Sequence, residues 1–139
     1  MGRARASARA EMSQRQLRVG EGLRHVLAEL LMRGELRDPL LAEASLTVTE
    51  VRPSRDLRHA TVFVTRLGGE LGDDLLAALA RAAPYLRGEA ARRLHLKYAP
   101  ELAFRPDTSF AEAARIETLL EEERAQLARQ SEDDDGGKA

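Results

Sequence analysis

The first clear pattern of hydrophobic positions is one apolar stripe at the three- and four-residue spacing of an α-helix. Its members are Val19, Leu23, Val26, Leu27 and Leu30. Ser13 and Gln16 stand ahead of it with the spacing of a capping box, so we expect a helix from Ser13. Gly34 predicts its end. We interpret Gly20 and Gly22 as points of close packing against a neighbouring segment, with approach of RNA as the alternative.

Two runs of alternating residues follow a loop marked by Asp38 and Pro39. Residues 46–51 and 59–66 are rich in β-branched side chains, and the short polar turn between them is typical of a β-hairpin. A third alternating run spans residues 95–104, where Pro100 favours an edge strand or a bulge. We therefore predict three strands.

A second helical pattern begins near Asp73 and carries Leu75, Leu76, Leu79 and Leu86. Proline removes a backbone donor and clashes with the preceding turn, so the helix should kink or split at Ala82, Ala83 and Pro84. The second piece should run to about Leu94. Residues 69–72 match GxxG, the phosphate-clamping loop of KH domains, but they follow a strand, and we interpret them as a strand-to-helix turn.

The end of the chain predicts one more helix and an irregular tail. Ser109 and Glu112 repeat the capping-box spacing, and Ile116, Leu119 and Leu120 follow on one side. The acidic SEDDDGGKA segment has the composition of a disordered region. We predict a flexible basic arm (1–11), a folded domain (12–106), a C-terminal helical extension (107–128) and a disordered acidic tail (129–139).

The fold class is α+β. The predicted order is helix, strand, strand, helix, kink, helix and strand, which is the order of a type II KH fold. The expected architecture is therefore a single KH-like domain, followed by the C-terminal helix and the acidic tail. A chain of 139 residues is long enough for one domain with its own core.

Composition narrows the function classes. The chain has no cysteine, which excludes disulfides, thiol nucleophiles and cysteine-based metal sites. No apolar run is long enough for a membrane span, and the basic start lacks the apolar segment of a secretory signal. We expect a cytoplasmic protein with no cofactor and no metal.

The charge is divided unevenly along the chain. Residues 1–106 carry 18 Lys and Arg against 13 Asp and Glu, whereas residues 107–139 carry 4 against 10. Arginine forks onto phosphate, so a basic body is suited to a nucleic-acid partner, although a GC-rich genome also favours Arg over Lys. The candidate RNA-binding residues are Arg15, Arg18, Arg52, Arg55, Arg58, Arg81, Arg87, Arg92, Arg93, Lys97 and Arg105.

Catalysis has little support in the sequence. His25, His59 and His95 lie far apart and lack metal-ligand spacing. Asp56 and His59 share the hairpin turn, where a serine could join them, but nothing resembles a nucleophile elbow. We expect no enzymatic activity.

Four stretches resemble one family, ribosome-binding factor A. Asp38-Pro39 precedes the first strand. The hairpin reads VRPSRDLRHATVFVT over residues 51–65, the kink reads AAPYLR over 82–87, and the last strand reads KYAPELAFRPDTS over 97–109. The resemblance covers about residues 12–120. Pro84 replaces the family's usual glycine at the kink, and Lys97 replaces its usual arginine.

The resemblance implies a function that composition alone does not indicate. Family members are bacterial assembly factors that bind the free 30S ribosomal subunit and 16S rRNA. They assist late maturation of that rRNA, including processing of its 5′ end, and are linked to growth in the cold. They have no catalytic activity, and in some bacteria a ribosome-associated GTPase releases them. On this basis we expect a monomer that binds RNA and no membrane.

An alternative is a protein-interaction module that acts through the C-terminal amphipathic helix, residues 107–128. Its apolar stripe, Ile116 to Leu120, lies beside a run of acids and suits a partner protein. Docking of this helix on its own domain is the simpler expectation.

Overall fold

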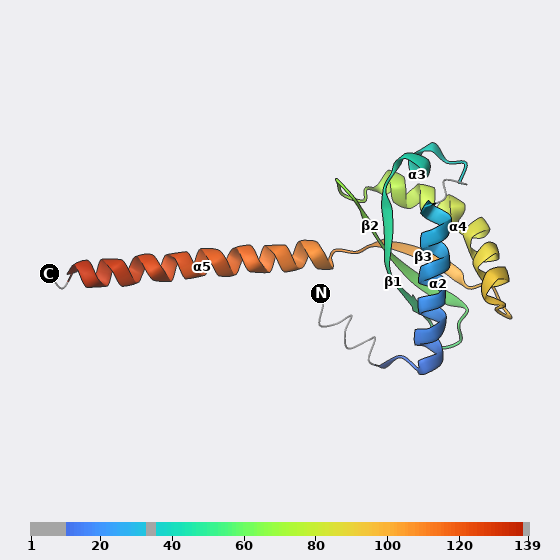
Figure 1. Cartoon of the computed structure of the whole chain (residues 1–139), viewed down its shortest axis with the longest axis horizontal. Helices are drawn as coiled ribbons and strands as arrows, with labels where there is room; N and C mark the ends of the chain where they lie inside the picture. Colours follow the sequence, from blue (N-terminus) through green and yellow to red (C-terminus); the bar gives the residue numbers. More distant parts are fainter. Residues whose placement is uncertain (1–10, 33–35, 138–139) are drawn as a thin grey trace. The chain divides into compact units, whose positions relative to one another are not determined.

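The computed structural model describes residues 11–32 and 36–137. The basic arm up to residue 10 and Gly34 lie outside the described residues. The chain divides into two compact units, Gly2–Asp107 and Thr108–Ala139, and each is described by itself. The first unit, called the body below, contains α2, α3, β1, β2, α4 and β3, and the second contains α5 (Figure 1).

Helix α2 (Gln14–Met32) starts at the predicted capping box. The Ser13 hydroxyl accepts from the Gln16 amide at 3.1 Å, and the Gln16 side chain accepts from the Ser13 amide at 2.9 Å. Gln16 is itself buried, and its Nε2 donates to the Pro53 carbonyl at 3.0 Å. The same side chain therefore caps the helix and ties its first turn to the end of the neighbouring strand.

Gly20 and Gly22 are positions of close packing, which confirms the first of the two interpretations of these glycines. A Cβ atom on Gly20 would lie 2.6 Å from the Val51 carbonyl oxygen, and one on Gly22 would lie 3.1 Å from the Leu94 side chain. The missing side chain at Gly20 lets α2 run directly along β1 (Figure 1).

The predicted hairpin is confirmed. Strands β1 (Leu46–Pro53) and β2 (His59–Arg66) pair antiparallel, with a bulge between Val48 and Glu50. The bulge breaks the strict alternation expected for this run, so Val48 and Val51, three residues apart, are both buried.

The third strand, β3 (Glu101–Pro106), is an edge strand parallel to β2, and the sheet order is β1-β2-β3. The prediction of a strand over residues 95–104 is wrong for its first half. His95 ends the preceding helix in the left-handed conformation, with φ at 53°, and the chain then needs residues 96–100 to return to the sheet. The alternation of Leu96 and Tyr98 therefore belongs to a connecting loop.

One helix of the body was not predicted, and another shows the predicted kink without a split. The Asp38-Pro39 segment opens a short helix, α3 (Pro39–Glu43), because Asp38 accepts from the Leu40 amide and proline suits the first helical position. Helix α4 (Asp73–Leu94) is continuous through Pro84 and does not split. Its axis bends instead, between the lime and yellow halves (Figure 1).

Burial explains why both halves of α4 stay on the core. Leu75, Ala78 and Leu79 are buried before the proline, and Leu86 and Ala90 are buried after it. They join the leucines of α2 and the valines of the hairpin in one cluster. Residues 69–72 form the turn from β2 into α4, as predicted.

Helix α5 spans Ser109–Gly137. It begins at Ser109 itself, and the Thr108 hydroxyl donates to the Glu112 carboxylate at 3.5 Å. The helix continues through most of residues 129–139, so a disordered acidic tail is not confirmed there. Glu, Ala, Arg, Gln and Leu supply enough helix propensity to continue the local hydrogen bonding. Within residues 11–32 and 36–137, no helix has the length and apolar character needed to cross a bilayer.

Candidate nucleic-acid interface

The hairpin turn is a locked structure and not a catalytic one. The Ser54 hydroxyl donates to the Asp56 carboxylate at 2.6 Å and accepts from the His59 amide at 3.1 Å. The His59 ring lies instead 3.7 Å from the Glu101 carboxylate. The serine proton is thus directed at a carboxylate, which gives no nucleophile activated by an imidazole.

The same turn fixes the ionisation of its carboxylate. The Ser54 hydroxyl and then the Arg58 amide hold the pKa of Asp56 below its ordinary value. Leu57 closes the turn with a positive φ of 61°. Across the described residues, no group of three His, Cys, Asp or Glu side chains is arranged to hold a metal ion.

Three of the candidate arginines on α4 have carboxylate partners in the body. Arg81 bonds Asp38 at 2.8 Å, and Arg92 bonds Glu89 at 2.8 Å. Arg93 lies 3.6 Å from Glu29 on α2 and 3.5 Å from Glu89. These ion pairs lower the pKa of Asp38, through Arg81, and of Glu89, through Arg92.

Arg87 and Arg52 are partly buried. The Arg87 guanidinium donates to the Ala99 carbonyl at 2.8 Å, which fastens the loop before β3 to α4. Arg52 lies 5.5 Å from the centre of the Phe63 ring and 3.8 Å from the Glu50 carboxylate. The assignment of these five arginines to RNA stays a prediction. Each of them already has a partner within the body, and Arg81, Arg87 and Arg93 join α4 to another segment.

The other six candidate cations are exposed, and no ion pair engages them within the described part of the chain. They are Arg15, Arg18, Arg55, Arg58, Lys97 and Arg105. They come from the first turns of α2, the hairpin turn, the loop over residues 95–100 and β3. Their charge is therefore available to an outside partner.

Most of these cations meet at one end of the body. A hollow of about 270 Å³ lies between the start of α2, the hairpin turn and the 95–100 loop. It is lined by Arg15, Asp56, Leu57, Leu96, Lys97 and Tyr98. The Arg58 guanidinium lies 4.8 Å from the centre of the Tyr98 ring, and Lys97 Nζ lies 5.5 Å from it. The surface formed by Arg15, Arg55, Arg58, Lys97 and Tyr98 is called the cationic end below.

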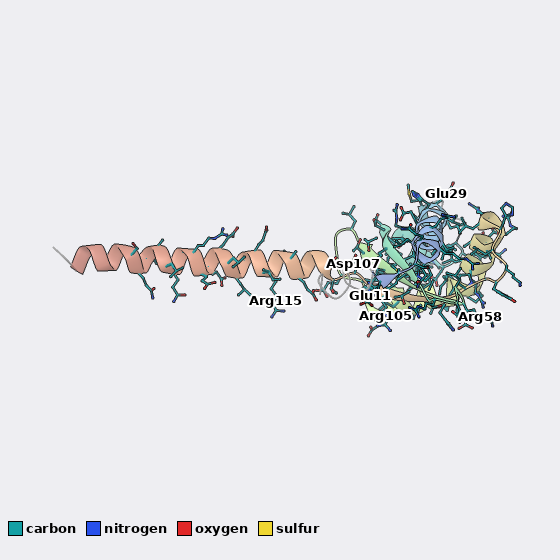
Figure 2. The ribbon with its side chains drawn as sticks, turned by 90° about the horizontal axis from the view of Figure 1, so that it is seen from below. Glu11, Glu29, Arg58, Arg105, Asp107 and Arg115 are labelled. Carbon is teal, nitrogen blue, oxygen red and sulfur yellow. The ribbon has the colours of Figure 1, made fainter. Side chains whose placement is uncertain are left out.

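Two of the exposed cations lie outside this cluster. Arg18 follows Arg15 by about one turn of α2 and extends the charge along the helix. Arg105 pairs in register with Phe63, four residues along β2 from His59, about 13 Å from the hairpin end of that strand. Figure 2 shows Arg58 and Arg105 at separate points of the body.

One of the predicted kink residues, Ala82, borders a second, larger hollow of about 510 Å³. Its lining comes from the segment before α3 and from the first half of α4, and it consists of Leu36, Arg37, Asp38, Ala78, Arg81, Ala82 and Tyr85. Ala82 belongs to it, whereas Pro84 is exposed on the helix surface. The hollow therefore lies beside the bend and is bordered by two arginines, of which Arg81 is paired with Asp38.

Sequence reasoning missed Tyr98. It treated this residue as part of a strand, whereas the ring is 51% exposed beside Arg58. Asp56 was considered only as a catalytic residue, although it lines the hollow. The usable signal is the Lys97-Tyr98 pair shortly before Pro100, because proline in an alternating run argues against a strand interior.

Comparison with known proteins identifies the family. The sequence profile of the Ribosome-binding factor A family matches residues 15–120. Ribosome-binding factor A of Phenylobacterium zucineum is 54% identical over 110 residues, which are 79% of this chain and 76% of that relative. Ribosome-binding factor A of a Methylobacterium species (strain 4-46) is 52% identical over 125 residues, which are 90% of each chain.

Two solved structures are also similar. The crystal structure of ribosome-binding factor A from Thermus thermophilus is 33% identical, with a TM-score of 0.56 over 66% of this chain and 94% of that one. A homology model of the Thermus thermophilus factor, fitted into a cryo-electron microscopy map of a 30S complex, is 33% identical. Its TM-score is 0.51, over 63% of this chain and 89% of that one.

The profile match includes all six exposed cations and both hollows. The relatives share more than half of their aligned residues with this chain over most of its length. The sequence match and the shared fold agree, and this chain belongs to the Ribosome-binding factor A family.

Proposed function

We propose that this protein is a non-enzymatic assembly factor that binds the free 30S ribosomal subunit and assists late maturation of 16S rRNA, including processing of its 5′ end. Family membership supports the ribosomal target, because the relatives are named as ribosome-binding factors. The Thermus thermophilus factor, moreover, has been fitted into a map of a 30S complex.

The observation that carries this proposal is the cationic end. Arginine and lysine side chains that are exposed and make no ion pair within the described residues can neutralise phosphates and release condensed counterions. The locked hairpin turn and the Arg87 bond to the 95–100 loop hold in place the backbone that carries Arg55, Arg58 and Lys97. A rigid set of cations suits the backbone and shape of a folded RNA.

The body is then a KH-like domain of type II, and the element order of α2, β1, β2, α4 and β3 supports this assignment. A bent, unbroken α4 stands where the predicted fold has two helices. The remaining parts of the proposal rest on family membership alone. We propose on this basis that the protein is a cytoplasmic monomer, that it has a role in growth in the cold, and that a ribosome-associated GTPase releases it.

The test is co-sedimentation of the full chain with 30S subunits, 50S subunits and 70S ribosomes across a salt series. We expect binding to 30S subunits alone, with affinity falling as salt rises. The double variant Arg55→Glu/Arg58→Glu should weaken binding roughly tenfold or more and lower the salt slope by about two. Equal binding to all three particles, or no binding to any, would contradict the proposal.

The charge-matched control is Arg37→Glu/Arg66→Glu. Both arginines are exposed and neither belongs to the cationic end. This control should bind 30S subunits like the wild type if location, and not total charge, decides affinity. An equal loss in both double variants would indicate a general polycation effect.

A second candidate is a protein-interaction module built on α5. Among its described side chains, four large apolar ones are between 44% and 59% exposed, namely Ile116, Leu119, Leu120 and Leu127. Removal of residues 108–139 distinguishes the two candidates. Asp107 should be kept, because its amide donates to the Val64 carbonyl at 2.8 Å and its carboxylate accepts from the Thr49 hydroxyl. The assembly-factor proposal expects binding to the RNA of the 30S subunit to survive, whereas the second candidate expects the binding of its partner protein to be lost.

A further inference from the structure

The hollow at the cationic end combines the cations of a phosphate site with two features that such a site does not need, an aromatic ring and a carboxylate. It contains a half-exposed aromatic ring, Tyr98, an acidic side chain, Asp56, and two cations, Arg15 and Lys97. Its volume of about 270 Å³ is just below the range of about 300–1,000 Å³ typical for drug-sized ligands, so it suits a group the size of one nucleobase.

Tyr98 can provide a stacking surface. The Arg58 guanidinium lies over its ring and holds it in place, while half of the side chain stays exposed. Unstacked bases of RNA are bound on aromatic side chains of this kind, and such stacking tolerates any base because each has a π-face. Tyr98 therefore accounts for binding of a base but not for a choice among bases.

Asp56 can provide that choice. Its Oδ1 accepts from the Ser54 hydroxyl and the Arg58 amide. Within the described residues no hydrogen bond engages its Oδ2, which keeps two acceptor positions. A carboxylate in the wall of the hollow repels a phosphate and attracts N–H donors.

The four bases differ in the donors on their Watson–Crick edges. Guanine presents two adjacent donors, N1–H and N2–H, which point in nearly the same direction and can both bond to the open acceptor positions of one carboxylate. Adenine and cytosine each place a ring-nitrogen acceptor beside their amino group, and uracil flanks its single N–H with two carbonyls. A carboxylate that accepts and never donates therefore favours guanine.

We propose that this hollow binds one unstacked guanine nucleotide from a single-stranded segment of rRNA, with the base on Tyr98, its Watson–Crick edge on Asp56 and its phosphates on Arg15 and Lys97. This inference deepens the proposed function and rests on it for the source of the RNA. It assigns the cationic end a choice of base in addition to general attraction for phosphate.

The test is titration of the full-length ¹⁵N-labelled chain with the RNA pentamers UUGUU, UUAUU, UUCUU and UUUUU, followed by amide chemical shifts. We expect UUGUU to bind about fivefold to a hundredfold more tightly than the other three, the discrimination typical of a paired contact to one base. Shifts should be concentrated in the hairpin turn and in residues 95–100.

Two variants separate the roles of the two residues. Asp56→Asn retains an oxygen for the Ser54 and Arg58 bonds but places an amide donor on the other side, so it should abolish the preference for guanine. Tyr98→Leu should weaken all four pentamers by about fivefold or more, because it removes the stacking surface. It also removes the ring under Arg58, but it leaves the bonds of Asp56 to the Ser54 hydroxyl and the Arg58 amide in place. Tyr85→Leu is the matched control, since Tyr85 is similarly exposed, at 46%, but borders the other hollow.

The outcomes are distinct. Equal affinity for the four pentamers, or an unchanged guanine preference in Asp56→Asn, would overturn the proposal. Normal 30S co-sedimentation without pentamer binding would also overturn it and leave the proposed function standing. A guanine preference without 30S co-sedimentation would support the site and contradict the proposed function.

Discussion

The arginines of α4 and the cations of the cationic end have the same charge but different surroundings. Arg81, Arg92 and Arg93 each lie against a carboxylate of the body, and Arg93 links α4 to α2. Arg15 and Arg58 are exposed, and no ion pair engages them among the described residues. The difference shows that a count of arginines does not locate an RNA-binding surface. Five of the eleven candidate cations already contact a carboxylate or carbonyl group of the body.

Substitution of Arg87 should have the largest effect, and this effect should be a loss of stability of the fold. Arg87→Leu removes the charged donor of the Ala99 carbonyl, so we expect the free energy of unfolding to fall by about 1–3 kcal/mol in urea denaturation. Arg87→Lys should not restore stability, because an ammonium lacks the planar fork. A different result would place Arg87 among the RNA-contacting cations. In that result Arg87→Lys has wild-type stability, and Arg87→Leu keeps its stability but binds 30S subunits more weakly.

Substitution of Arg15 should have an intermediate effect, and this effect should be on the binding of 30S subunits. Arg15→Gln removes one phosphate contact, so we expect the slope of log affinity against log salt for 30S subunits to fall by about one. Arg92→Gln should leave that slope unchanged, because Glu89 already engages Arg92. Equal changes in the two variants would show that internal pairing does not separate the two groups. Urea midpoints of both variants should stay near the wild-type value.

The ion pair of Asp38 with Arg81 should show the smallest effect. Arg81 and then the Leu40 amide hold the pKa of Asp38 below its ordinary 3.8. A carboxyl with a lower pKa in the folded state stabilises the fold above its unfolded pKa and loses that contribution as pH falls through the folded pKa. When the pH is lowered below about 4, the urea midpoint of the wild type should therefore fall. The urea midpoint of Arg81→Ala should fall less, because the variant has already lost the pair. Arg81 is exposed and Asp38 is partly exposed, so solvent screens the pair and the difference is small. Identical pH profiles would exclude a stabilising pair.

Parts of the fold that depend on nearby residues were predictable. The Ser13–Gln16 capping box, the hairpin and the buried stripe of α2 follow from the order of residues along a few turns. The short helix after Asp38 was missed although its signal is local, since an Asp before Pro predicts a helix start as well as a loop.

The candidate site was predictable only in part. Arg55 and Arg58 were identified from one polar turn, and they are exposed there. Tyr98 was missed because its alternation with Leu96 imitates a strand, whereas the left-handed His95 sends the chain into a loop. Arg87 was grouped with the RNA-binding residues because its partner, the Ala99 carbonyl, is a backbone atom that no side-chain pattern reveals.

The sequence by itself determined the helix caps, the hairpin, the basic body and the family, because these depend on short-range spacing and on residue types. Tertiary structure alone decided which cations are paired, where β3 begins and that Arg15, Asp56 and Tyr98 line one hollow. The physical reason is that exposure and pairing depend on segments that meet only after the sheet has closed. Arg93 on α4 contacts Glu29 on α2, and Arg58 on the hairpin contacts Tyr98, because elements far apart in the chain pack together.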